Sequence, residues 1–96
     1  MTEKEYLLTC LAEECIEVAK EVHKALRFGL DDTNPATKQT NAEAIKNELT
    51  DIVAVLEELK RVGVLLAPYS KDSEYYNQKI ERLAEWFKYS RERRKN

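Results

Sequence analysis

The sequence predicts an all-α fold, a helical bundle of three main helices completed by oligomerisation, and three observations support that prediction. The 96 residues include only two glycines and two prolines, which fall at three places and divide the chain into helical segments. Within these segments, apolar residues recur at the three- and four-residue spacing of amphipathic helices. The apolar faces are too wide for three helices to cover among themselves, so we expect a dimer that completes a four-helix arrangement.

The first helix is expected at about residues 2–27, with Gly29 as its C-terminal cap residue. A polar link follows at residues 28–40. In this link, Asn34 before Pro35 has the pattern of an N-cap with proline at the first helical position, which predicts a short helical turn. The apolar stripe of the first helix comprises Leu7, Leu8, Leu11, Cys15, Val18, Val22, Ala25 and Leu26.

The second helix is expected at about residues 41–62, with Asn41 as N-cap and Gly63 just beyond its end. After a turn around Pro68, Asp72 or Ser73 is expected to cap a third helix that runs to about Arg91. The candidates for the dimer interface are Tyr75, Trp86 and the broad apolar arc of the second helix. The apolar stripe of the third helix comprises Tyr76, Ile80, Leu83 and Phe87.

Length and charge predict a single domain spanning residues 1–96, with a basic tail over about 91–96 that is expected to fray. The formal net charge is only −2, so neither nucleic acid nor a membrane surface is expected as a partner. Cys15 lies on an apolar stripe and is expected to be a small buried hydrophobe, which favours a reducing, cytoplasmic location. The longest apolar run, residues 62–67, is far short of the ~20 residues that a membrane span needs.

Glu48 is the residue that most strongly indicates a functional site. Its neighbours at helical spacing are all apolar, and a carboxylate taken into such surroundings must be compensated or protonated. A bound cation would be one compensation. Those neighbours are Ile45, Ile52, Val55 and Leu59.

A second acidic pair supports the cation hypothesis. Glu14 borders the stripe of the first helix and Glu17 follows it by three residues, just as Asp51 follows Glu48. If the two helices pack antiparallel, the four side chains converge. Carboxylates without histidine or thiolate partners are hard oxygen ligands, so the pattern favours Mg²⁺, with Mn²⁺ as a substitute.

Two alternatives were weighed against a magnesium site. A di-iron bundle needs Glu-x-x-His pairs, and the single histidine, His23, follows Lys20 at that spacing and is expected to be a solvated surface residue. The other alternative is a set of ordinary helix-face acids paired with lysine or arginine. The repetition on two helices favours the metal site.

At these residues the sequence resembles a known family. The run EECIE at residues 13–17 matches an E-E-x-x-E motif, and ELTD at residues 48–51 matches its E-x-x-D partner. The pair is similar to the signature of MazG-like, all-α nucleoside triphosphate pyrophosphohydrolases of the small phage and bacterial type. The resemblance extends through residues 24–32 and 86–91 and so covers most of the chain.

The resemblance implies a bundle that forms a homodimer or homotetramer and hydrolyses nucleoside triphosphates with Mg²⁺. The expected products are a nucleoside monophosphate and pyrophosphate, in nucleotide-pool house-cleaning with deoxynucleotides as the favoured substrates. By the same resemblance, Glu13 takes the catalytic position, where it is expected to orient or deprotonate the attacking water. The metal ligands implied are Glu14, Glu17, Glu48 and Asp51.

Substrate phosphates require positive groups near the metal, and the candidates are Lys24, Arg27 and Lys79. Two other functions remain open at this point. One is a non-catalytic helical dimer that acts as an adaptor or regulator. The other keeps the catalytic fold but hydrolyses phosphoribosyl-ATP, a subgroup that the tail after Trp86 fits less well.

Overall fold

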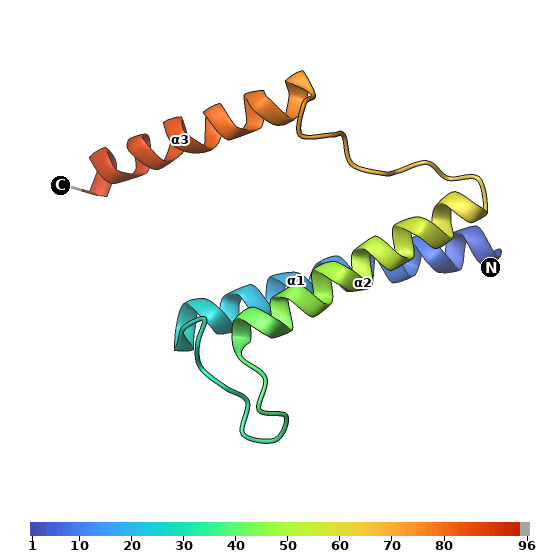
Figure 1. Cartoon of the computed structure of the whole chain (residues 1–96), viewed down its shortest axis with the longest axis horizontal. Coiled ribbons are helices and arrows are strands. Elements are labelled where there is room, and N and C mark those ends of the chain that lie inside the picture. The colour runs from blue at the N-terminus through green and yellow to red at the C-terminus, as the bar shows by residue number, and fades with distance from the viewer. Residues whose placement is uncertain (95–96) are drawn as a thin grey trace.

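The protein forms three α-helices, seen in a computed structural model that describes residues 1–94 (Figure 1). They are α1 (Glu3–Phe28), α2 (Asn41–Arg61) and α3 (Glu74–Arg94). The described residues contain no strand, and their only bridge of β type joins Thr33 to Thr40. The all-α prediction with three main helices is therefore confirmed.

Both ends of α1 are closed by local hydrogen bonds. At its start, the Thr2 hydroxyl accepts from the backbone N–H of Glu5 at 3.1 Å, and the Glu5 carboxylate accepts from the backbone N–H of Thr2 at 3.0 Å. This reciprocal capping box satisfies two donors that a helix start leaves free. At its end, Gly29 has a φ of 99° and donates its N–H to the carbonyl of Ala25 at 2.7 Å. Gly29 is thus the C-terminal cap, as predicted.

The start of α2 differs by one residue from the prediction. Thr40, not Asn41, is the N-cap, because its hydroxyl accepts from the backbone N–H of Glu43 at 3.1 Å. Asn41 is instead buried, and its side-chain amide donates to the carbonyl of Gly29 at 2.8 Å. Asn41 therefore ties the first turn of α2 to the end of α1.

The link between α1 and α2 contains turns at residues 30–31 and 35–37 and no further helix. The Asn34 side chain accepts from the backbone N–H groups of Ala36 at 2.8 Å and Thr37 at 3.3 Å. The backbone N–H of Lys38 donates to the carbonyl of Asn34 at 2.8 Å. The helical turn expected at Asn34 and Pro35 is therefore a single turn, after which Lys38 reverses the chain with a φ of 64°.

α1 and α2 lie antiparallel and form a helical hairpin (Figure 1). Their contact includes Leu59, in the last turn of α2, which is completely buried, and Leu7 and Ala25, which are each 9% exposed. At the open end of the hairpin, the Arg61 guanidinium lies 2.6 Å from the Glu3 carboxylate. Both partners of that ion pair are half exposed, so we expect it to contribute less than about 1 kcal/mol. Apolar burial therefore holds the hairpin together.

The contact with α2 covers only a narrow sector of α1. Cys15 is exposed and Cys10 is half-buried, so the prediction that Cys15 is buried is wrong for the described chain. The physical reason is that Cys15 lies at the flank of the stripe, on the side where Leu8 and Val22 are also about 40% exposed. His23 is exposed, as predicted.

α3 stands apart from the hairpin. It makes no contact with α1 or α2, and none of its described residues is buried. Ser73 caps its start, since the Ser73 hydroxyl accepts from the backbone N–H of Tyr76 at 3.2 Å. The helix continues to Arg94, so the part of the predicted frayed tail that the structure describes is helical, and residues 95–96 lie outside the described range.

None of the three helices, within residues 1–94, is both long enough and apolar enough to cross a membrane.

Replacing Leu59 tests whether its burial stabilises the hairpin. Leu59→Ala should lower the free energy of unfolding by about 2–5 kcal/mol, because it removes a completely buried side chain and leaves a cavity between α1 and α2. Leu30→Ala, at a residue that is 57% exposed, is the matched control and should change it by less than about 1 kcal/mol. Chemical denaturation followed by circular dichroism measures both, and equal effects would contradict the placement of the core.

Candidate metal centre

Three acids from two helices meet on the hairpin. Glu14 of α1 and Glu48 and Asp51 of α2 each offer one carboxylate oxygen, and these three oxygens lie within 4.8 Å of one another. Glu14 and Glu48 are half-buried and Asp51 is exposed. The antiparallel packing predicted for the two helices brings this acidic cluster together, because the inward face of each helix carries acids at matching heights.

The surroundings of Glu48 disfavour its ionised form. The pKa of Glu48 is raised, mainly by a side-chain hydrogen bond with Glu14, then by burial, and further by the negative charges of Glu14, Asp51 and Glu17. A hydrogen bond between two carboxyl groups requires a proton on one of them. The surroundings of Glu48, with Glu14 as the main contributor, therefore favour its protonated form.

No basic side chain neutralises the cluster. Among residues 1–94, no ion pair involves Glu14, Glu48 or Asp51. Ordinary ion pairing, the alternative weighed from the sequence, is therefore not found for these three acids. Oxygen ligands at this spacing, with no counter-charge, fit a hard divalent cation such as Mg²⁺.

Glu17 lies outside the group of three. Its carboxylate is 4.0 Å from the Lys20 ammonium, and both side chains are well exposed. Its charge still contributes to the raised pKa of Glu48, so it lies at the border of the cluster. The four predicted ligands are thus three assembled acids and one neighbour that is turned toward a lysine.

Glu13 is exposed on α1 and does not belong to the cluster. Adjacent residues of a helix point about 100° apart, so Glu13 cannot share the direction of Glu14. Its charge acts instead on Tyr6, where a hydrogen bond with Cys10 is the main cause of a raised pKa and Glu13 adds a smaller effect.

The three cations predicted to bind phosphate are divided between two places. Lys24 and Arg27 line a shallow cavity of about 330 Å³ at the end of α1, together with His23 and Phe28. Lys24 follows Glu14 by ten residues, which is roughly 15 Å along the helix axis. Lys79 lies on α3, which has no contact with the hairpin. The structure therefore brings none of the three into the acidic cluster.

Glu21 is an acid that the sequence analysis did not single out. Its side chain is only 12% exposed, and its Oε2 atom has no hydrogen-bond partner among the described residues, although the Lys24 ammonium lies 3.2 Å away. The contact is thus a charge pairing without a directed hydrogen bond. The signal in the sequence is its spacing, since Glu21 follows Glu14 by seven residues and returns to the same helix face.

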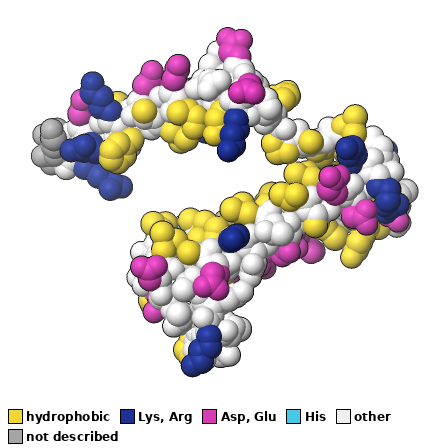
Figure 2. Space-filling view, in the orientation of Figure 1, with side chains coloured by type: hydrophobic (Ala, Val, Ile, Leu, Met, Phe, Trp, Pro, Cys, Tyr) yellow, Lys and Arg dark blue, Asp and Glu magenta, His cyan; other side chains and the backbone are white. Residues whose placement is uncertain are grey.

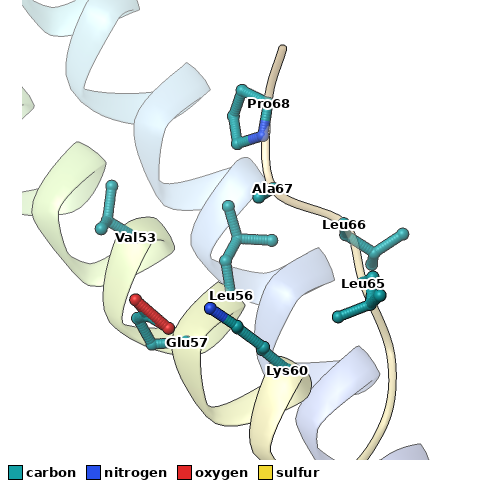
Figure 3. A pocket seen from close by; sticks show the side chains of 8 residues that line it. All are labelled: Val53, Leu56, Glu57, Lys60, Leu65, Leu66, Ala67 and Pro68. Atoms are coloured by element: carbon teal, nitrogen blue, oxygen red, sulfur yellow. The ribbon is translucent and has the colours of Figure 1, made fainter. Parts of the chain in front are cut away.

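A mainly apolar cavity lies elsewhere, between α2 and the link that leads to α3 (Figure 3). Its volume is about 330 Å³, and its only charged lining residues are Glu57 and Lys60. Helical spacing puts Val53 and Leu56, which line it, on a different face of α2 from Glu48 and Asp51. This apolar cavity is therefore separate from the acidic cluster.

Comparison with known proteins gives no match: no protein-family model, curated protein or solved structure is similar to this chain.

The raised pKa of Glu48 makes a prediction about stability and pH. Because the folded protein holds this proton more tightly than the unfolded chain, the stabilising contribution is fully present below the unfolded pKa, near 4.5, and is lost as pH rises through the folded pKa. In metal-free buffer, the wild type should therefore lose stability relative to Glu48→Gln as pH rises through that range. Denaturation curves of both proteins across pH measure the difference in their free energies of unfolding. A difference that does not change with pH would contradict the raised pKa of Glu48.

Proposed function

We propose that this protein is a Mg²⁺-dependent nucleoside triphosphate pyrophosphohydrolase that acts in the cytoplasm as a homo-oligomer. The single observation that carries the proposal is the meeting of Glu14, Glu48 and Asp51, without a counter-charge, on an antiparallel helical pair. The similarity of residues 13–17 and 48–51 to the MazG-like motifs supports the same class.

In this proposal, the acidic cluster binds the metal in its ionised form. Glu14, Glu48 and Asp51 hold Mg²⁺, or Mn²⁺ in its place, and Glu17 joins them by turning away from Lys20. When bound, the cation supplies charge neutralisation for the triphosphate and favours ionisation of water. The raised pKa of Glu48 fits this role, because a divalent cation at the cluster would favour the ionised carboxylate over the protonated form that Glu14 and burial favour.

The remaining residues orient the reactants. Water attacks one phosphorus of the triphosphate, the bond to the bridging oxygen breaks, and the products are a nucleoside monophosphate and pyrophosphate. Glu13 is the proposed residue that orients or deprotonates the water. Lys24 and Arg27 offer positive charge farther along α1, where the cavity at the helix end is open to the outer part of a nucleotide. Lys79 lies on α3, so it can take part only if α3 packs against a hairpin that carries the acidic cluster.

A second candidate function is that of a non-catalytic helical adaptor. The observation that favours it is the amount of exposed apolar surface, which includes Trp86 and Phe87 at 63% and 65% exposure. Surfaces of this kind commonly contact other proteins. Metal binding distinguishes the two functions, because an adaptor has no need of it.

Thermal melting with and without Mg²⁺ tests the metal site. At a Mg²⁺ concentration of 100 times its dissociation constant, the folded state should gain about 2.7 kcal/mol, which for this size is on the order of 10 °C or more in Tm. Asp51→Asn should remove most of the shift. Glu85→Gln, on α3 and outside the cluster, is the matched control and should keep it. A wild-type Tm unchanged by Mg²⁺ and Mn²⁺ would favour the adaptor.

Pyrophosphate release tests the activity. The eight common ribo- and deoxynucleoside triphosphates are incubated with protein and Mg²⁺, and we expect pyrophosphate and monophosphate as products, with deoxynucleotides preferred. Glu48→Gln should lower the rate by a factor of about 100 or more, since it removes a proposed metal ligand and not only a supporting group. Glu85→Gln should leave it unchanged. Full activity in Glu48→Gln, or orthophosphate as the sole inorganic product, would contradict the proposal.

A further inference from the structure

The chain exposes more surface than a folded protein of its size normally does. Its accessible surface is 8166 Å², whereas a compact monomer of 11.2 kDa exposes about 5,700 Å². Its radius of gyration is 17.1 Å, against about 12.5 Å for a compact domain of this length. Roughly 2,500 Å² of surface therefore lacks the cover that folding usually provides.

Part of this surface is the apolar stripe of α3. Its members are between 38% and 65% exposed, and no other helix touches them. An isolated helix of this length is marginal in water unless an apolar face packs against something. α3 therefore needs a partner surface. The stripe consists of Tyr76, Ile80, Leu83 and Phe87.

A second uncovered surface runs along the hairpin. Helical spacing on two antiparallel helices puts its residues on one side, away from the edge that carries Glu14 and Asp51. Figure 2 shows hydrophobic side chains along the hairpin edge that faces α3, and along the α3 edge that faces the hairpin, with open space between them. We call this surface the apolar hairpin face, and it consists of Leu8, Val22 and Leu26 of α1 and Leu49 and Val53 of α2.

The apolar cavity beside α2 extends this face toward the link. Leu56 and Pro68 line it, and Figure 3 shows Leu56 directed from α2 toward the link. A cavity of about 330 Å³ has room for a large side chain from another helix. α2 and α3 have 21 residues each, so both are about 31 Å long and can lie along one another over their full length.

The link between α2 and α3 favours contact with another molecule over contact with the same chain. It comprises residues 62–73, whereas connections between neighbouring helices of one bundle usually have about 2–8 residues. Pro68 prevents the link from continuing either helix. In Figure 1 the link carries α3 clear of the hairpin to which it is attached.

We infer that a second copy of this chain fills the open space, and that each α3 packs its stripe on the apolar hairpin face of the partner. A second copy is the occupant that fits, because one two-fold exchange covers both kinds of exposed surface at once and leaves no open contact. The uncovered area also agrees, since twice roughly 2,500 Å² lies at the upper end of the range for obligate homodimers. The exchange of α3 goes beyond the proposed activity and holds for an enzyme or an adaptor.

A charge placed in the stripe tests the exchange in the full-length protein. By light scattering, the wild type should have about twice the 11.2 kDa mass of one chain, and Leu83→Asp should have the mass of one. Gln78→Asp introduces the same side chain on the opposite side of α3 and should remain a dimer. A monomeric wild type, or a Leu83→Asp protein that is still dimeric, would overturn the inference. Because α3 makes no contact with α1 or α2, the hairpin of Leu83→Asp should keep its helical signal.

Thiol cross-linking shows which hairpin α3 contacts. One tagged copy carries Leu83→Cys with both native cysteines replaced by serine, and an untagged copy carries Cys10→Ser and keeps the exposed Cys15 on α1. After mixing and treatment with a short bismaleimide, a product of the mixed mass supports exchange, and its absence overturns it. In a third variant, with both Cys15 and Leu83→Cys on one chain, cross-linking within single chains in place of dimers would also overturn it, because α3 would then fold back on its own hairpin.

Discussion

The structure depends on the antiparallel contact between α1 and α2. That contact buries Leu59 completely and fixes which residues of the two helices stand opposite one another. The same contact half-buries Glu48 and places it against Glu14, so one interaction both stabilises the hairpin and raises the pKa of Glu48. Stability and chemistry are therefore coupled: the two helices cannot separate without dispersing the acidic cluster.

The half-buried positions of Glu14 and Glu48 affect the free energy of unfolding. A small protein has little apolar burial to spare, and a half-buried acid pair without a counter-charge lowers its stability. In the proposed function, a hard divalent cation that binds only the folded hairpin would offset this disadvantage, because its chemistry matches carboxylate oxygens.

Most of the local structure could be predicted from the sequence, because helical spacing and caps are written in short segments. Gly29 and Ser73 were predicted as caps and act as caps. The N-cap of α2 was misplaced because Thr40 and Asn41 are both suited to it, and only the buried bond from Asn41 to Gly29 decides between them. The burial of Cys15 was predicted wrongly, because an apolar stripe in the sequence shows how wide the apolar face is. It does not show how much of that face one neighbouring helix covers.

The candidate site was predictable to the same extent and for the same reason. Glu48 stood out because its whole helix sector is otherwise apolar, and Glu14 and Asp51 follow from the antiparallel register. Glu17 could not be separated from them by spacing alone, since its turn toward Lys20 is a side-chain choice between two exposed positions. The partner of α3 was also beyond the sequence of a single chain, because the stripe specifies that something must cover it but not which molecule.

The hydrogen bond from the Asn41 side chain to the Gly29 carbonyl helps to set the alignment of α1 and α2, which in many hairpins depends on the length of the loop. The side-chain bond is joined by backbone hydrogen bonds from Asn41 to the Asp32 carbonyl at 2.9 Å and from Ala42 to the Leu30 carbonyl at 3.0 Å, so the alignment is held at the base of the loop. Residues 34–39 lie beyond these bonds. Their tip, near Asn34, is the part of the molecule where evolution or an engineer can lengthen the chain or add a peptide while the helices beneath keep their alignment.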